Sequence, residues 1–507
     1  MGESRARGTP SNFRLLVTMQ QRTDICDTDD SIHATKTINM LSDDVLLEIF
    51  DFSRMGHDTH GFPFPAVLEW RTLVHVCRRW RQIVFASPLR LDLQLLCTHG
   101  TPVKNNLGVW PPLPLIVDYY TDWDADDAKS PTTILSEEVD ILTALNHPDR
   151  VRYVGISATK SLLGKMASVM QEPLPMLTHL SLSSKDGKVP VLPETFFGGS
   201  TPRLRVAHLE GIPFPTFPTF LLSTTDLVDL QLVNIPEAGY VSPDVMVASL
   251  FALTRLETLS IGFQSSTPRV EPRFLPPLAR VVFPSLTAFN FRGASEYLED
   301  LVARIDTPLF QHFTIVYFNQ LYFHIPLLSQ FISRTGSLDI ARFKHARVEF
   351  GESQVCVSLY EEPVDPPESF ESRFALQISC QYLDWQLPHM TEVLSQSSVV
   401  LSHVGDLSID ARDLQPGWRA DLHVEPSDWL ALLSPFVGVE TLRVSKQLAG
   451  HVALALEDTT RGNAAGRLPA LHSLCLENQP EESVEQYIGE RKISGHPVKV
   501  STGNTQG

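Results

Sequence analysis

Cysteine is scarce in this 507-residue sequence, and its spacing argues against two kinds of stabilised fold. The six cysteines are scattered, and no two of them form a Cys-x-x-Cys pair. A disulfide framework and a zinc site are therefore not expected. The sequence also lacks an Asn-x-Ser/Thr glycosylation signal. Together these absences predict a protein of a reducing compartment, either the cytosol or the nucleus.

Basic side chains are outnumbered, with 41 Lys and Arg against 59 Asp and Glu and a formal net charge of −18. Such an acidic chain has no electrostatic footprint for nucleic acid or an anionic membrane surface, so we expect neither as a partner. Residues 307–333 carry no charge and are long enough to cross a bilayer. They also hold several polar groups that would be costly in hydrocarbon. We predict a buried strand followed by a short helix there.

Motifs of catalysis and cofactor binding are absent from the sequence. It has no Walker loop, no Gly-x-Gly-x-x-Gly, no His-Glu-x-x-His and no Gly-x-Ser-x-Gly. His57, Asp58 and His60 have a conceivable metal spacing, but no Cys or further His is near them in their Gly/Pro-rich loop. We therefore expect no catalytic residue, no cofactor and no metal, and the protein is not predicted to be an enzyme.

Apolar residues make up 43% of the chain, which is enough for a large core. Shifts in composition divide the sequence into successive parts. We predict a disordered tail at 1–37, a helical block at 38–98, a Pro/Asp-rich linker at 99–135 in which 113–117 are a candidate strand, a repeat region at 136–480 with an atypical insertion at about 338–400, and a C-terminal tail at 481–507.

The repeat has the form apolar-x-x-apolar-x-apolar. Seven units follow one another at intervals of 23 to 30 residues, and three more come after a gap; they begin at Val151, Leu177, Leu204, Leu227, Leu256, Leu286, Phe310, Val404, Val439 and Leu471. The last two apolar positions of a unit are two residues apart, so both point to one face of a short strand. The period predicts an α/β fold, an irregular leucine-rich-repeat solenoid of short parallel strands with helices on its outer face.

The insertion at 338–400 departs from this pattern. Residues 355–360 and 374–380 are predicted to form a strand pair that flanks the acidic loop 361–371. A second departure is the aromatic-rich segment 211–220. It could anchor a partner, but a proline-stiffened loop packed on the edge of the repeats is the favoured interpretation.

Polar residues alternate with the apolar positions of the predicted strands. They would face away from the core, where a protein substrate could bind. The residues predicted to bind the substrate are His179, Ser181, Asp229, Gln231, Thr258, Ser260 and Asn290, and His208 belongs to the same pattern.

The block at 38–98 contains two amphipathic segments. Ser42 is predicted to be the N-cap of the first helix, with Asp43 in its first turn, where the positive helix end favours a carboxylate. The second segment places Val76 and Trp80 on an apolar face. About fifty residues of this kind barely make a core, so the block is expected to need a partner.

The segments LSDDVLLEIF and LVHVCRRWRQIVFASP resemble an F-box in the form seen in fungal, mushroom-type F-box proteins, and the repeats resemble the divergent leucine-rich repeats of that family. Leu41-Ser42 replaces the usual Leu-Pro opening, and the loop 53–69 is longer than in a typical F-box. The resemblance implies a non-catalytic substrate-recognition subunit of a Skp–cullin–F-box ubiquitin ligase.

In this family the F-box docks on a Skp-type adaptor and, through it, on a cullin–RING ligase. By motif position, the implied adaptor-binding residues are Leu41, Val45, Leu46, Ile49, Phe50, Val76 and Trp80. Some of them are also expected to hold the helices together. Two alternatives remain open: an adaptor-bound scaffold outside any ligase, and a leucine-rich-repeat protein-binding module without ubiquitin function.

Overall fold

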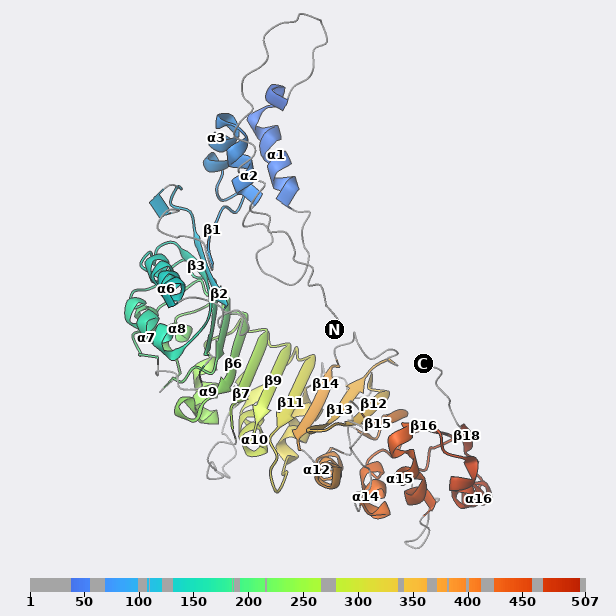
Figure 1. Cartoon of the computed structure of the whole chain (residues 1–507). Helices are drawn as coiled ribbons and strands as arrows, with labels where there is room; N and C mark the ends of the chain where they lie inside the picture. The colour runs from blue at the N-terminus through green and yellow to red at the C-terminus, as the bar shows by residue number, and fades with distance from the viewer. Residues whose placement is uncertain are drawn as a thin grey trace, which may run out of the picture. The chain divides into compact units, whose positions relative to one another are not determined.

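The computed structural model divides the chain into two compact units, Met1–Leu91 and Asp92–Gly507 (Figure 1). The predicted tail 1–37 and the candidate metal residues His57 and His60 lie outside the described residues. These are 38–54, 69–98, 107–108, 110–120, 131–184, 186, 192–214, 217–265, 280–335, 342–362, 372–380, 383–397, 401–411, 424–457 and 468–501.

The first unit is helical. A short 3-10 turn, η2 (Ile38–Met40), precedes the helices α1 (Asp43–Arg54), α2 (Glu69–Val76) and α3 (Arg78–Ala86). The Ser42 hydroxyl accepts a hydrogen bond from the Val45 amide at 3.3 Å, which confirms the predicted N-cap. Cys77 is extended between α2 and α3, and its sulfur accepts from the Trp80 amide at 3.5 Å.

The core of this unit joins all three helices. Leu46 and Phe50 of α1 are buried, as is Val74 of α2, and the Phe50 ring lies 4.7 Å from the Trp80 ring of α3. Arg79 adds a polar link, because its guanidinium donates to Asp43 at 2.6 Å and to the Leu41 carbonyl at 2.6 Å. The start of α1 is thereby fixed to α3.

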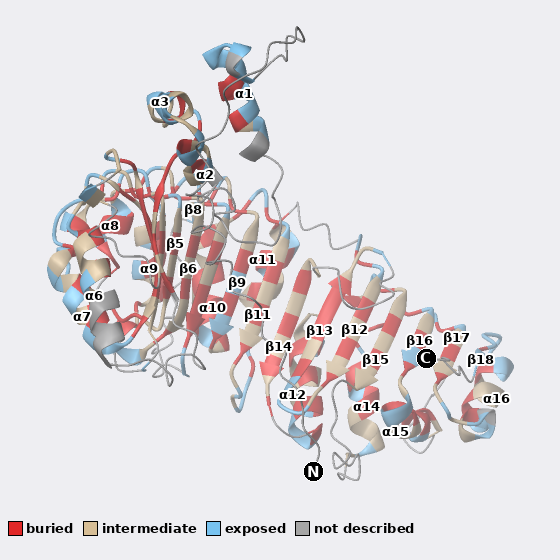
Figure 2. Ribbon diagram, turned by 45° about the horizontal axis from the view of Figure 1, so that its top comes forward, coloured by how far each residue is buried: buried red, intermediate tan, exposed pale blue. Residues whose placement is uncertain are grey.

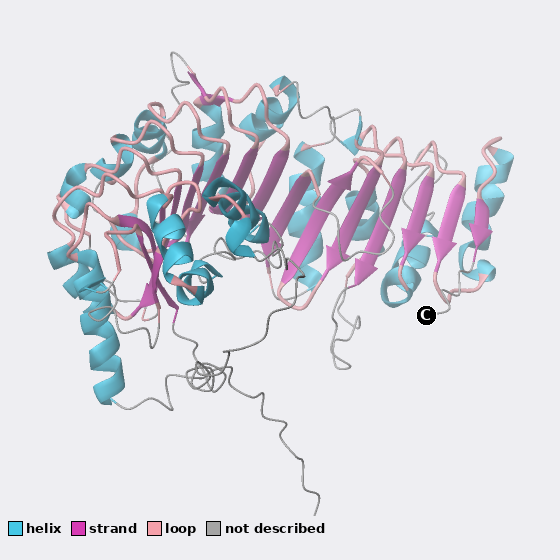
Figure 3. Ribbon diagram, turned by 90° about the horizontal axis from the view of Figure 1, so that it is seen from above, coloured by secondary structure: helices cyan, strands magenta, loops and turns pink. Residues whose placement is uncertain are grey.

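The second unit is built on one sheet of sixteen strands, most of them parallel, which confirms the predicted α/β class (Figures 1 and 3). In spatial order the strands are β1 (Leu95–Cys97), β2 (Leu115–Tyr120), β3 (Val151–Ala158), β4 (His179–Ser184), β5 (Val206–Glu210), β6 (Asp229–Ile235), β7 (Thr258–Phe263), β9 (Ala288–Gly293), β11 (His312–Tyr317), β14 (Phe374–Ser379), β13 (Gln354–Tyr360), β12 (His345–Phe350), β15 (Asp406–Ala411), β16 (Thr441–Val444), β17 (Ser473–Leu476) and β18 (Lys499–Ser501). A two-stranded sheet pairs β8 (Val281–Val282) with β10 (Ile305–Asp306).

Helices occupy many of the connections between strands. They are α6 (Pro131–Leu145), α7 (Lys160–Val169), α8 (Thr219–Leu222), α9 (Pro243–Leu250), α10 (Ser295–Ala303), α11 (Pro326–Arg334), α12 (Leu383–Gln396), α14 (Pro426–Leu433), α15 (Lys446–Glu457) and α16 (Glu485–Ile493), with 3-10 turns η3 (Phe196–Gly199), η4 (Glu237–Gly239) and η8 (Glu481–Val484). Figure 1 shows α9, α10, α12, α14 and α15 in a row along one side of the sheet.

The apolar positions of the repeat lie in register across the strands. The second apolar positions of six units are direct cross-strand partners of one another: Leu180, Ala207, Leu230, Leu259, Phe289 and Phe313. The third apolar positions pair in the same way: Leu182, Leu209, Leu232, Ile261, Phe291 and Ile315. All of them are buried, and Figure 2 shows the resulting bands of buried residues across the strands. The predicted strands are therefore confirmed, because a two-residue period fixes which side chains reach the core.

The insertion interrupts this order. β13 and β14 are the predicted strand pair, and they are antiparallel. β13 is also antiparallel to β12, which was not predicted, and β14 rather than β12 pairs with β11. β11 and β14 are parallel, so the chain leaves both strands at the same edge of the sheet.

Three predicted boundaries need correction. The predicted linker 99–135 contains β2, which pairs with β1 and β3, and β1 itself lies in the predicted helical block but belongs to the second unit. Four prolines of that segment precede β2 and the fifth, Pro131, begins α6, so none removes a donor from the ladder. The predicted C-terminal tail contains α16 and β18, and β18 pairs with β17.

The uncharged stretch 307–333 contains β11 and all of α11 except its last residue, as predicted. The β11 side chains Phe313 and Ile315 are buried in the sheet core, as are Phe331 and Ile332 of α11. In the described part of the chain, no helix is both long enough and apolar enough to cross a membrane.

Candidate functional site

An exposed apolar stripe runs along α1. Val45, Ile49 and Phe52 are 43%, 44% and 79% exposed, and their spacing of four and three residues places them on one face of the helix. We call these three residues the α1 stripe. Val76, at the end of α2, is also exposed. Such residues are available to a partner without any change in the unit.

The seven implied adaptor contacts divide into two groups. Val45, Ile49 and Val76 are exposed, and Leu41 and Trp80 are partly exposed. Leu46 and Phe50 lie on another side of α1 and are buried in the core, so they belong to the residues expected to hold the helices together. Phe52 was missed, although its helical spacing from Val45 and Ile49 is visible in the sequence.

The second unit carries a polar face on its sheet. Two rows of cross-strand partners cross β4 to β9 here. One consists of Ser181, His208, Gln231, Ser260 and Asn290, and the other of His179, Val206, Asp229, Thr258 and Ala288. These side chains alternate with the buried rows, so they point away from the core. The seven residues predicted to bind a substrate therefore lie together, on what we call the polar face.

Hydrogen bonds pair the side chains of this face. The Gln231 amide donates to both carboxylate oxygens of Asp229, at 3.2 and 3.0 Å. The Asn290 amide donates to the Ser260 hydroxyl at 3.1 Å. Within the described residues, Nε2 of His208 is buried without a hydrogen-bond partner. The face thus offers both donors and acceptors to a ligand.

Burial shifts the pKa of two of these residues. It lowers the pKa of His179, and the positive charges of Arg152 and Arg205 add to the effect. The His179 ring is therefore neutral at pH 7. Burial also raises the pKa of Asp229, while the hydrogen bond from Gln231 acts in the opposite direction.

Sequence reasoning missed three polar residues at the carboxyl ends of the same strands. The Glu210 carboxylate accepts from the Ser183 hydroxyl at 3.0 Å and from the Asn234 amide at 2.9 Å. Glu210 and Ser183 continue the alternation by two residues, which the sequence could have revealed. Asn234 could not be found this way, because it reaches the carboxylate from an irregularity in β6, with a φ of 52°.

Gly155 marks a close approach on β3. A Cβ atom there would lie 2.6 Å from the Tyr153 hydroxyl and 2.9 Å from a carboxylate oxygen of Asp118. Only glycine leaves room for these two groups beside the strand. The alternation of apolar and polar residues does not indicate that the Tyr153 hydroxyl and the Asp118 carboxylate lie here, because the Tyr153 side chain bends over its own strand.

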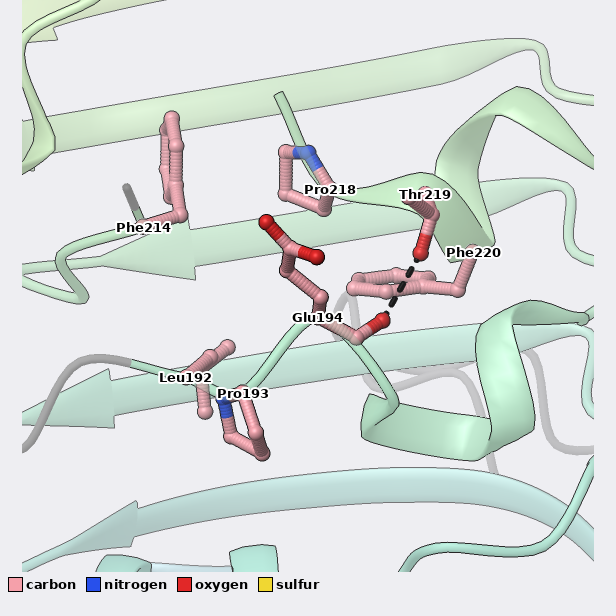
Figure 4. Close-up of a pocket in the computed structure, with 7 residues that line it drawn as sticks. All are labelled: Leu192, Pro193, Glu194, Phe214, Pro218, Thr219 and Phe220. Atoms are coloured by element: carbon pink, nitrogen blue, oxygen red, sulfur yellow. Dashed lines mark hydrogen bonds between the residues drawn. The ribbon is translucent and has the colours of Figure 1, made fainter. Parts of the chain in front are cut away.

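The aromatic side chains of the segment 211–220 are buried. Phe214, Phe217 and Phe220 are buried, which confirms the interpretation as a packed loop. Phe214 and Phe220 also border the cavity drawn in Figure 4, whose volume of about 10 Å³ has room for about one water. Its walls are completed by Leu192, Pro193, Glu194, Pro218 and Thr219.

Neither the side chains nor known proteins assign a reaction to this chain. Among the described residues, no three His, Cys, Asp or Glu side chains are placed to share a metal ion. No model of a known protein family matches the chain, and no curated protein does. The α1 stripe and the polar face are therefore the features from which a function can be argued.

Proposed function

We propose that the protein is a substrate receptor of a Skp–cullin–F-box ubiquitin ligase of the cytosol or nucleus. The α1 stripe carries this proposal. A three-helix unit that leaves Val45, Ile49 and Phe52 in water has apolar surface for a partner to cover. The F-box resemblance of the same helix supports a Skp-type adaptor as that partner.

The energy available from this stripe supports specific docking. Full burial of one large apolar side chain is worth about 1.5–3 kcal/mol, and the three side chains lie on a helix whose position is fixed by the Phe50–Trp80 contact and by Arg79. A rigid helix face loses little further conformational entropy on binding.

The second unit supports the receptor role. Its irregular repeats form, in this proposal, a leucine-rich-repeat solenoid whose polar face holds a protein substrate. The receptor performs no covalent step. It raises the effective concentration of a substrate lysine at the ubiquitin-charged enzyme that the cullin recruits.

The experiment is co-purification of the full chain with the Skp-type adaptor and cullin. The variant carries Val45→Asp and Ile49→Asp, which place charge on the stripe but leave the buried residues intact. We expect adaptor binding to weaken at least thirtyfold, corresponding to about 2 kcal/mol. Leu89→Asp is the matched control, because Leu89 is a strongly exposed apolar residue of the same unit outside α1.

Each outcome selects one interpretation. The receptor interpretation would be supported if adaptor and cullin co-purify with the wild type and with the control variant but not with the stripe variant. Adaptor without cullin would favour a scaffold outside the ligase. Failure of the wild type to bind the adaptor would overturn the proposal. Circular dichroism of the variants checks that the helices remain folded.

A further inference from the structure

The reversed insertion brings two distant segments together at one edge of the sheet. Because β11 pairs in parallel with β14, the segment 318–325 after β11 lies beside α12, which follows β14. The Phe323 ring packs at 5.4 Å against His389 of α12, and His389 in turn lies 6.2 Å from the Trp385 ring.

Side chains of α12 fix the backbone of this segment. The Phe323 amide donates to Glu392 at 3.2 Å, and the Ile325 amide donates to the Gln396 side chain at 2.8 Å. Within the segment, the side-chain amide of Gln320 donates to the Tyr322 carbonyl at 2.7 Å. The segment is a connection between strand and helix, yet its polar backbone groups are held as in an ordered element.

Three large side chains nevertheless point into water here. Leu321, Tyr322 and Trp385 are 75%, 76% and 50% exposed. We call these three residues the Tyr322 surface. Tyr and Trp on a rigid support are the residue types that dominate binding energy in protein interfaces, because they bury a large area and have few rotatable bonds.

The charged side chains of α12 are all acidic. Residues 307–333 carry no charge, and α12 contains Asp384 and Glu392 but no Lys or Arg. Asp384 is exposed next to Trp385. Burial lowers the pKa of His389, so its ring adds no positive charge at pH 7. Aromatic faces beside a carboxylate attract a cation, above all the planar guanidinium of arginine.

A cation–π contact within the chain is present at the same edge of the sheet. The guanidinium of Arg292 lies 5.8 Å from the centre of the Phe318 ring, at the start of the segment. Among the described residues, no guanidinium takes the equivalent place over Tyr322 or Trp385.

We propose that the Tyr322 surface binds an arginine-bearing segment of a protein partner. The guanidinium stacks on Tyr322 or Trp385 and pairs with Asp384, while Leu321 covers the aliphatic part of the side chain. This inference does not rest on the proposed ligase function, because all of its residues belong to the second unit.

The test uses the full chain and three fluorescein-labelled peptides at about 150 mM salt. The peptides share a Gly/Ser sequence and carry three Arg, three Lys or three citrulline residues; citrulline keeps the shape of arginine without its charge. We expect fluorescence anisotropy to show binding of the Arg peptide, weaker binding of the Lys peptide, and none of the citrulline peptide.

Two pairs of variants localise the binding. Tyr322→Ala combined with Trp385→Ala should weaken binding of the Arg peptide at least tenfold. Phe251→Ala removes an exposed aromatic residue elsewhere and should leave the affinity for the peptide unchanged. Asp384→Asn should weaken it severalfold, whereas Glu237→Gln, which removes another exposed carboxylate, should not.

Three results would overturn the proposal. They are no binding of the Arg peptide, equal binding of the citrulline peptide, and equal binding by the Tyr322/Trp385 variant. The last would mean that the net charge of −18 attracts the peptide without a site. Co-purification with the adaptor should be unchanged in this variant, so failure here and failure of the ligase proposal are distinguishable.

Discussion

Glu299 shows how one buried carboxylate can join two helices. It lies on α10 and is almost fully buried, and its two oxygens accept from the amides of Leu327 and Leu328 at 2.8 and 2.7 Å. These amides belong to the first turn of α11, where a negative charge is favoured. Burial outweighs the two hydrogen bonds and raises the pKa of Glu299 from 4.5 to about 7.

This raised pKa predicts a stability that depends on pH. Between pH 4.5 and 7 the unfolded chain releases the Glu299 proton, while the folded chain retains it. The folded state therefore binds more protons, and its contribution to stability is fully present below pH 4.5 and lost as the pH rises through 7. The slope from this group is at most about 1.4 kcal/mol per pH unit.

Urea unfolding at pH 5, 6 and 7 measures the effect. We expect Glu299→Gln to lower stability at pH 5, since its amide cannot accept both backbone hydrogens, and to flatten the fall between pH 5 and 7. Glu296→Gln changes an exposed carboxylate of the same helix and should keep the wild-type slope. An unchanged slope in Glu299→Gln would rule out this origin of the pH dependence.

Local signals in the sequence predict some of these residue roles and not others. The Ser42 cap acts on an amide three residues away, so the local pattern contains it. Glu299 acts on a helix that begins 27 residues later, and no local pattern contains that contact. Leu46 and Ile49 are equally apolar in sequence. Only the packing against α2 and α3 decides that the first is buried and the second exposed.

At the scale of a strand, β9 separates core from surface within two consecutive residues. Phe289 is buried and its ring stacks on Phe313 of β11 at 5.4 Å, whereas Asn290 is exposed on the polar face. Phe289→Ala should cost about 3–5 kcal/mol, because it leaves a cavity in the middle of the apolar row.

Asn290→Ala is the matched control on the same strand. It removes one hydrogen bond to Ser260 at the surface, so we expect a loss below about 1 kcal/mol. Denaturant midpoints for the two variants give the comparison. Similar losses would contradict the assignment of core and surface to the two faces of the sheet.

The apolar repeat predicts where most of the strands begin and which residues they bury. It does not predict the order β14–β13–β12, because antiparallel and parallel strands share the same two-residue alternation. The polar face follows from the repeat, since its rows alternate with the apolar rows. The Tyr322 surface does not, because it exists only where β14 has taken the place beside β11.

For the whole molecule, the division at Leu91 and Asp92 separates the α1 stripe from the Tyr322 surface. The α1 stripe belongs to the first unit, and the Tyr322 surface belongs to the second. Sites in separate compact units that share no partner residue are expected to act additively. We therefore predict that saturating adaptor changes the affinity of the full chain for the Arg peptide by less than twofold.

Anisotropy titrations of the Arg peptide with and without adaptor measure this independence. The double variant Val45→Asp, Ile49→Asp is the control, because adaptor should not alter its peptide affinity at all. Thermodynamic linkage makes the test reciprocal: if adaptor strengthens peptide binding by some factor, the peptide must strengthen adaptor binding by the same factor. A change of fivefold or more in both directions would contradict independence, and it would mean that adaptor binding in the first unit is energetically coupled to the Tyr322 surface.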